Sequence, residues 1–172
     1  AEFLKTNRPI KRYKKKYKKY KEVEMSLIAI GSIKMCRDLM ANGIIPRKTH
    51  LLQFPNKSSL PKHLRRHYIR GYFDGDGNIY TRKNEQNKIK NIQWQLVGNE
   101  QFLLRVQKIM SQELKMDKHK MQIIFPERNN NIRRLRWHSM INLLKIYYFL
   151  YDDATVFLER KHDIFQKVRD KV

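Results

Sequence analysis

The sequence of 172 residues contains a single cysteine, Cys36, and no long apolar run. One cysteine excludes an internal disulfide framework, so a reduced intracellular compartment is expected, either cytoplasm and nucleoid or an organelle matrix. A membrane-spanning helix needs about 18 consecutive apolar residues, so no membrane segment is expected, and no signal peptide is recognised. Hydrophobic residues still make up 41% of the chain, which is enough for a packed core.

Acidic residues are also scarce: 16 Asp and Glu stand against 38 Lys and Arg, which gives a net charge of +22. This charge exceeds what solubility requires and predicts a polyanionic partner. Every residue from 11 to 21 is Lys, Arg or Tyr. A solvated basic arm explains such a segment equally well, but the arm would still bind a polyanion because each neutralised phosphate releases a counterion. A membrane-binding segment would carry bulky apolar anchors, so nucleic acid is the preferred partner.

The pattern of apolar residues along the chain indicates an internal repeat whose two copies have diverged, in an α+β protein. Residues 1–24 form a basic Lys/Tyr-rich arm or strand, residues 25–60 a partial first repeat with its linker, and residues 61–172 a fuller repeat. In the partial repeat we expect a strand near 27–31, a helix capped by Ser32, and a strand over 49–55.

The fuller repeat is expected to follow the order αββαββα, with an additional helix at its end. Asn99 is the candidate cap of its second helix. The expected elements are, in chain order, residues 63–74, 78–82, 92–97, 102–114, 120–125, 131–139, 141–151 and 154–168.

Strands of the fuller repeat alternate apolar and polar residues, as Trp94 between Gln93 and Gln95 illustrates. An ordinary solvated sheet face would also carry polar residues, but it would mix both charges, and acids are nearly absent here. Arg pairs with guanine, and Asn or Gln with adenine, through the major groove, so this face suits base edges. The residues expected to bind DNA, from the arm and the strands, are Lys14, Lys15, Lys16, Tyr80, Arg82, Asn91, Gln93, Gln95, Lys120, Gln122, Arg134, Arg136 and His138.

The stretch GYFDGDG, residues 71–77, places two acids and three glycines in seven residues of this basic chain. A calcium-binding EF-hand loop fails on register, because Tyr72 and Lys83 would occupy its first and twelfth positions. A helix-ending turn with left-handed glycines explains Gly77. It leaves Gly71 unexplained, because a glycine inside a helix costs about 1 kcal/mol relative to alanine.

A third interpretation is that Gly71 and Gly75 allow a second helix to approach closely. Asp76 would then project from the helix end among bound phosphates, where a carboxylate requires a divalent cation. Mg²⁺ suits this position because it takes one or two carboxylates together with substrate phosphates. Two such helices side by side would hold two ions that clamp a phosphodiester during displacement. The motif therefore predicts nuclease chemistry with Mg²⁺ or another divalent cation.

Residues 69–77, IRGYFDGDG, resemble the signature helix of the LAGLIDADG homing endonucleases. The flanking stretches CRDLMANGIIPRKTHLLQFP and LYDDATVFLERKHDIF resemble bacterial, phage and organellar members of the same family. The resemblance covers residues 32–165. It implies αββαββα repeats paired through motif helices, with saddle-shaped antiparallel sheets on double-stranded DNA. It also implies site-specific hydrolysis of phosphodiester bonds with Mg²⁺, as part of intron or intein mobility.

By this resemblance Asp76 is the catalytic metal ligand, and the Gly75 carbonyl lies beside the same ion. Gly71 belongs to the helix pairing, and Asp74 caps the partner helix. The family often places a lysine near the active site, and three are candidates on charge alone: Lys83, Lys120 and Lys161. The last of them is expected to be an ordinary surface lysine on the final helix.

The chain carries one motif, whereas family members carry two in one chain or form homodimers with one each. Three alternatives stay open: a first motif removed upstream of Ala1, pairing with a second copy, or decay of the first half into a protein that does not cleave. The opening Ala1-Glu2-Phe3 resembles a cloning remnant and favours the first alternative. A non-cleaving DNA- or RNA-binding protein, such as a maturase or regulator, is the alternative function.

Overall fold

The structure is a computed structural model that describes residues 6–17, 20–46, 51–86, 89–117, 122–124 and 132–170. The chain divides into two units, Ala1–Ala41 and Asn42–Val172, and each is described by itself. Within the described ranges, every helix is too short or too polar to cross a membrane.

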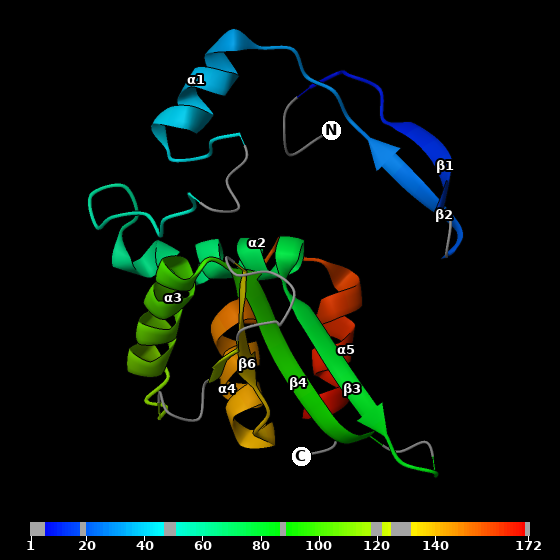
Figure 1. Ribbon diagram of the computed structural model, residues 1–172, viewed down its shortest axis with the longest axis vertical. Helices are drawn as coiled ribbons and strands as arrows, with labels where there is room; N and C mark the ends of the chain where they lie inside the picture. The colour runs from blue at the N-terminus through cyan, green and yellow to red at the C-terminus, as the bar shows by residue number, and fades with distance from the viewer. Residues whose placement is uncertain are drawn as a thin grey trace. The chain divides into compact units, whose positions relative to one another are not determined.

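The first unit contains a two-stranded hairpin and a helix (Figure 1). β1 (Lys11–Tyr17) pairs in antiparallel fashion with β2 (Tyr20–Leu27), so the basic segment is largely a strand. α1 (Ile33–Ala41) begins at the predicted cap, where the Ser32 Oγ accepts a hydrogen bond from the Met35 N–H at 3.2 Å. No residue of α1, all of which the structure describes, is buried.

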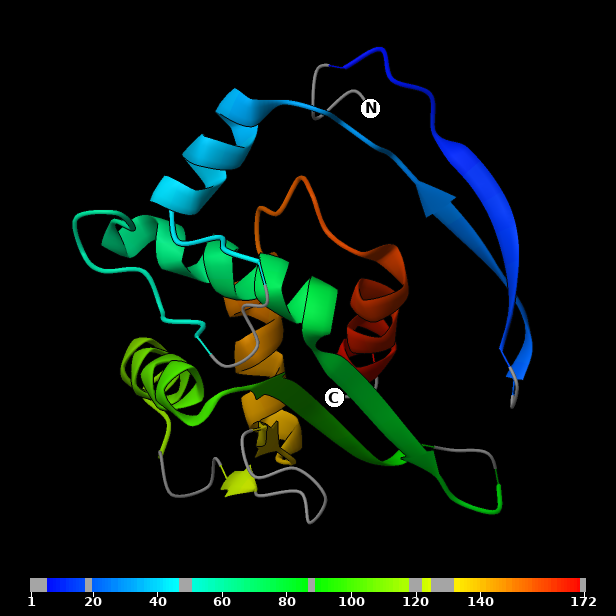
Figure 2. The same cartoon turned by 45° about the horizontal axis from the view of Figure 1, so that its top comes forward.

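The second unit has the predicted αββαββα order followed by a further helix, so the expected fold class is confirmed. Its strands form one antiparallel sheet in the order β3-β4-β6-β5. α2 leads into β3 almost without a loop (Figure 2). The elements are η1 (Lys62–Leu64), α2 (Arg65–Asp76), β3 (Asn78–Lys83), β4 (Ile89–Gly98), α3 (Glu100–Glu113), β5 (Gln122–Ile124), β6 (Arg133–Trp137), α4 (Met140–Tyr151) and α5 (Glu159–Arg169).

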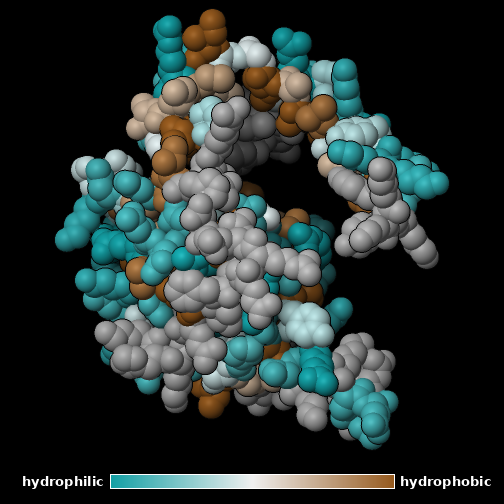
Figure 3. Space-filling view, in the orientation of Figure 1, coloured by the Kyte–Doolittle hydropathy of each residue, from teal (hydrophilic) through white to brown (hydrophobic). Residues whose placement is uncertain are grey.

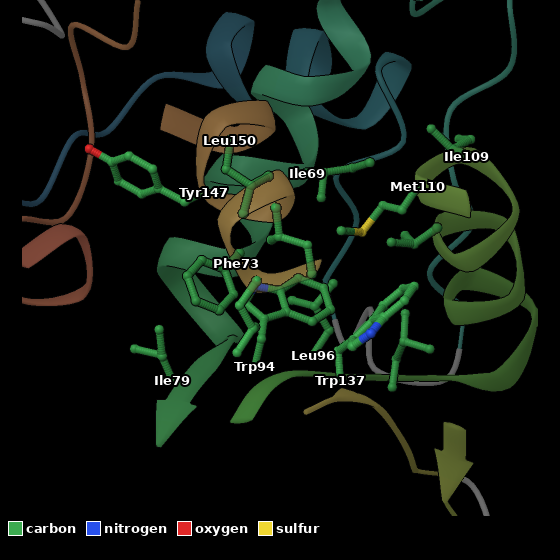
Figure 4. Packing of buried hydrophobic residues seen from close by; sticks show 14 of the residues in the cluster. Ile69, Phe73, Ile79, Trp94, Leu96, Ile109, Met110, Trp137, Tyr147 and Leu150 are labelled. Atoms are coloured by element: carbon green, nitrogen blue, oxygen red, sulfur yellow. The ribbon is translucent and has the colours of Figure 1, made fainter. Parts of the chain in front are cut away.

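The core lies on one face of this sheet. The strand register places Trp94 between Ile79 and Trp137, and all three side chains are buried. Helices α3, α4 and α5 contact the sheet, and they contribute buried side chains such as Met110 and Leu150 (Figure 4). Full burial of each large apolar side chain contributes about 1.5–3 kcal/mol to folding. The strands therefore turn their alternate, polar side chains to the opposite face.

The predicted cap of α3 is confirmed, because the Asn99 side chain accepts a hydrogen bond from the Phe102 N–H at 2.9 Å. A cap of this kind satisfies one of the unpaired donors at a helix start. The second polar atom of the same side chain has a different use, since Asn99 Nδ2 donates to the Leu52 carbonyl at 2.7 Å.

The two strands expected in the partial first repeat are wrong where the structure describes them. β2 ends at Leu27, and residues 28–31 and 51–55 form no strand, while residues 47–50 lie outside the described residues. Side-chain packing, together with the Asn99 bond to the Leu52 carbonyl, replaces strand pairing after residue 50. Leu52 is buried, and the Phe54 ring lies 5.1 Å from that of Tyr68.

Candidate nucleic-acid interface and metal-binding helix end

Gly77 alone separates α2 from β3, and its backbone N–H donates to the Phe73 carbonyl at 2.8 Å. Its φ angle of −81° lies in the region open to every residue, so the expected left-handed angle is wrong. Space is the reason for glycine here. A Cβ at this position would overlap the Phe73 ring and lie 2.6 Å from the Phe73 carbonyl oxygen.

Gly71 and Gly75 have the opposite environment. Both are exposed, and a Cβ added at either position would meet no atom within 4 Å. Their spacing of four residues places them on the same side of α2. α2 therefore presents two exposed positions without Cβ atoms, one turn apart, and the predicted close approach of another helix to them stays a prediction.

The two acids of the motif have different surroundings. Asp74 accepts hydrogen bonds from the Tyr151 hydroxyl at 2.7 Å and from the Leu158 N–H at 3.1 Å. Burial, followed by this hydrogen bond, raises the pKa of Tyr151. Leu158 directly precedes α5, which begins five residues later than expected, at Glu159. Asp74 thus joins α2 to α4 and α5, and its predicted role as a cap for a partner helix stays a prediction.

Asp76, the last residue of α2, is exposed. Its charge is felt nearby, because burial and then the Asp76 carboxylate raise the pKa of Tyr72. The Tyr72 hydroxyl in turn donates to the Val97 carbonyl at 2.7 Å. Of the two acids in the motif, Asp76 is therefore the carboxylate that an incoming cation can reach.

Lys161 is buried, with 1% of its surface exposed, so the expected surface position is wrong. Its ammonium group also lies 4.8 Å from the centre of the Phe73 ring. Cations at a helix C-terminus satisfy its last carbonyl groups and oppose its dipole. The Lys161 Nζ donates to three carbonyl oxygens around the end of α2: Phe73 at 2.5 Å, Asp74 at 2.9 Å and Gly77 at 2.5 Å.

The ammonium of Lys161 experiences opposing influences. Burial is the largest and lowers its pKa, the neighbouring Arg160 lowers it further, and the carboxylates of Asp74 and Asp76 raise it. Lys161 binds carbonyl groups on both sides of Gly75 and Asp76 in the sequence. It thereby fixes the backbone that carries the predicted metal ligands. Sequence reasoning missed this role because charge was the only signal considered.

Among the described residues, no three His, Cys, Asp or Glu side chains lie close enough to hold a metal ion. The end of α2 instead offers the exposed Asp76 carboxylate and the Gly75 backbone. Mg²⁺ fits such a sparse set, because it retains several waters and takes one or two carboxylates together with phosphates. These residues therefore fit a divalent cation only if its remaining ligands come from outside this set.

The predicted DNA-binding residues of β3, β4 and β6 share the polar face of the sheet. The register pairs Tyr80 with Gln93, Arg82 with Asn91, and Gln95 with Arg136, while Arg134 pairs with Val97. These strands contain no acidic residue. The structure thus brings together seven of the predicted residues on a surface of amides and guanidinium groups.

Gln95 and Arg136 form a preassembled pair on this face. The Gln95 Oε1 accepts from the Arg136 Nε at 3.0 Å and from the Gln93 Nε2 at 3.3 Å. An amide oxygen has two lone pairs, so both are occupied. Gln95 consequently presents only its NH₂ group as a donor. In the major groove adenine presents one acceptor and one donor, so a side chain that pairs with it needs both a donor and an acceptor. Guanine presents two acceptors, N7 and O6, so a side chain that pairs with it needs only donors. The Gln95 amide in this pair therefore differs from that of a free glutamine, which offers both a donor and an acceptor.

The remaining predicted residues lie outside these three strands. His138 is exposed just beyond β6, and Gln122 pairs in register with Arg136, although its side chain is not described. Lys120 lies outside the described residues, as does the side chain of Lys83. Three lysines belong to β1 of the first unit and are exposed: Lys14, Lys15 and Lys16.

Comparison with known proteins finds similar folds among solved structures. The homing endonuclease I-CvuI, in complex with its target in the presence of Ca, is 16% identical over 64% of this chain and 71% of its own, with a TM-score of 0.43. The archaeal intron-encoded homing endonuclease I-Vdi141I, complexed with DNA, is 15% identical over 63% of this chain and 69% of its own, with a TM-score of 0.47.

The LAGLIDADG homing endonuclease I-GzeII, in complex with its DNA target, is 11% identical over 83% of this chain and 45% of its own, with a TM-score of 0.48. These structures are homing endonucleases, the kind of protein that residues 69–77 resemble. No family model matches the chain, and no curated protein matches its sequence.

Alanine substitutions separate the two kinds of glycine in the motif. Gly71→Ala should stabilise the chain by about 0.5–1 kcal/mol, because the new methyl group meets open space and alanine favours a helix. Gly77→Ala should destabilise it by about 1–3 kcal/mol, because Phe73 must move. Urea unfolding of both variants measures the difference, and equal effects would contradict this assignment.

Lys161→Met should lower the free energy of unfolding by about 1.5–3 kcal/mol, because three carbonyl groups lose a charged donor. Lys145→Met is the matched control, since Lys145 is exposed on α4 and should change stability by less than about 0.5 kcal/mol. Urea unfolding with matched m-values tests the pair. Equal stability of the two variants would show that the Lys161 contacts contribute nothing.

Proposed function

We propose that this chain is a DNA-binding nuclease subunit of the LAGLIDADG homing endonuclease type, which hydrolyses phosphodiester bonds at a specific site with Mg²⁺. The observation that carries the proposal is the position of Asp76. This exposed carboxylate ends α2, and one residue later the chain enters the acid-free polar face of the sheet. A solvent-facing acid next to an acid-free, positively charged strand face supports the proposal, because a divalent cation would join the carboxylate to a phosphate bound there.

The chain's own residues would divide the work. Asp76 and the Gly75 carbonyl would bind the cation, which supplies a Lewis acid and lowers the pKa of a bound water. Lys161 would hold the helix end in place, and the polar strand face would orient the duplex. The open side of α2 at Gly71 and Gly75 would admit a second motif helix with the second carboxylate. That helix would come either from another copy or from a longer chain.

Double-stranded DNA is the proposed polymer because the donors lie on strands. A two-stranded ribbon enters the major groove of B-form DNA, whereas the deep, narrow major groove of RNA excludes side chains. The donor pair of Gln95 and Arg136 matches the guanine edge exposed there. Intron or intein mobility would follow from the proposed family and is part of the same proposal.

Asp76→Asn should abolish cleavage of a randomised duplex library in Mg²⁺ while leaving duplex binding nearly unchanged. The amide keeps the shape of the side chain but loses the charge that binds the cation. Asp163→Asn is the matched control, since Asp163 is exposed on α5 and outside the motif. Sequencing of the cut ends, at matched salt, reads out the site and the rate.

Two outcomes would contradict parts of this proposal. If the affinity of the wild-type chain for duplex DNA falls steeply with salt concentration but the chain cuts nothing, even with a second motif helix supplied in trans, the chain is a binding protein. If Asp76→Asn cuts as well as the wild type, the carboxylate is not a metal ligand, and the acid serves only the helix end.

Base readers and phosphate anchors should respond differently to substitution. Gln95→Ala releases Arg136 and should relax the preference at the facing base pairs by about 1–3 kcal/mol. Lys16→Ala, on the exposed strand β1, should instead weaken all sequences alike and reduce the salt slope by about 0.9. Selection from a randomised library at several salt concentrations tests both. A changed target sequence for Lys16→Ala would refute the division.

A further inference from the structure

A second basic surface lies within the second unit, apart from the strand face. A cleft of about 510 Å³ opens between the segment that leads into α2 and the outer side of α3. Lys57, Lys62 and Arg65 line it from the first side, and Arg105 and Lys108 line it from α3. Hydrophilic side chains cover this part of the molecule, over η1, the start of α2 and α3 (Figure 3).

The cleft is strongly positive. Its one acid, Glu113, lies 3.4 Å from the Lys62 Nζ and is thereby paired. The other four cations form no ion pair within the part of the chain that the structure describes. Like charges held together repel, and an anion in the cleft would relieve this repulsion. The net surplus suits several phosphate groups rather than a single carboxylate.

The chemistry of the lining selects phosphate over bases. Among the residues that the structure describes, no aromatic side chain lines the cleft, and the remaining lining side chains are Ile109 and Gln112. Bases of single-stranded nucleic acid are normally held by stacking on aromatic rings. Arg, in contrast, binds phosphate oxygens through two parallel hydrogen bonds, and Lys binds them as a point charge. The ligand is therefore recognised through its backbone.

The cleft and the strand face belong to opposite sides of the sheet. α3 buries Phe102, Val106 and Met110 against the apolar side of the sheet, whereas Arg105 and Lys108 lie outside this buried stripe. Gln95 and Arg136 lie on the polar side. A duplex segment resting on the polar side cannot occupy the cleft at the same point, because the sheet and α3 lie between them.

We propose that this cleft binds the phosphate backbone of a second nucleic-acid segment, independent of base sequence. The segment is either a distant part of the same molecule or another molecule. The inference rests on the proposed function only for the choice of nucleic acid as the polymer. The cleft itself would recognise a row of phosphate groups, whichever molecule carries them. Free polyphosphate is the competing source of the same chemistry.

The experiment uses an abasic oligodeoxynucleotide, which carries phosphates and no bases. In the double variant Arg105→Gln/Lys108→Gln, its affinity should fall several-fold, and the salt slope should shrink by about 1.4, at about 0.7 for each of two phosphate contacts. Backbone amide resonances of α3 should shift on titration of the wild-type chain and stay in place in the variant. A second double variant, Lys57→Gln/Lys62→Gln, removes cations from the opposite wall and should act alike.

The matched control is Lys145→Gln/Lys167→Gln, which removes the same charge from exposed positions of α4 and α5. An equal loss of affinity in this control would overturn the proposal, since net charge alone would then explain it. Displacement of the oligonucleotide from α3 by tripolyphosphate at equal phosphate concentration would overturn its assignment to nucleic acid. Unshifted α3 resonances in a chain that still binds duplex would overturn the cleft and leave the proposed function standing. If the chain bound no duplex DNA at all, the result would contradict the proposed function itself.

Discussion

The ammonium group of Lys161 holds together the part of the second unit on which the proposed chemistry depends. It binds three carbonyl groups where α2 meets β3, and it does so from α5, at the far end of the chain. Asp74 supports the same junction, because it accepts from Tyr151 of α4 and from the backbone before α5. The Asp76 side chain is thus exposed, whereas the backbone that carries it is held from several directions. The proposed role of Asp76 as a metal ligand would need such support, since a displacement of about 1 Å already weakens catalysis.

Side chains alternate between the two sides of the sheet, so one side can pack the core while the other stays open to a partner. One side carries the buried Trp94 and Trp137 and the helices that cover them, so it gives the unit its stability. The other side needs no packing partner and is available for polar groups of one charge sign. The absence of acids from β3, β4 and β6 is costly in mutual repulsion when no anion is bound. A surface of that kind is understandable in a protein whose partner supplies the opposite charge.

Sequence patterns predicted the features that depend on near neighbours. Strand alternation, the αββαββα order and the caps at Ser32 and Asn99 follow from residues a few positions apart. Lys161 and Phe73 are 88 residues apart, and no local pattern distinguishes a lysine that reaches a distant helix end from one in water. The strand expected near residue 51 failed for a related reason. Phe54 packs on Tyr68 of α2 and Phe102 of α3, and Asn99 satisfies the Leu52 carbonyl that a strand would have paired.

The hydrogen bond between Gln95 and Arg136 has a consequence for how a target sequence would be encoded. The Arg136 guanidinium donates to the Gln95 amide oxygen, so the two side chains do not reorient independently. If this face reads DNA as proposed, a base change opposite one of them would alter the position of the other, and neighbouring base pairs would be read as a coupled unit. Effects of double base changes would then be non-additive, as for any two groups in direct contact. This face would therefore recognise adjacent base pairs together rather than each base pair separately.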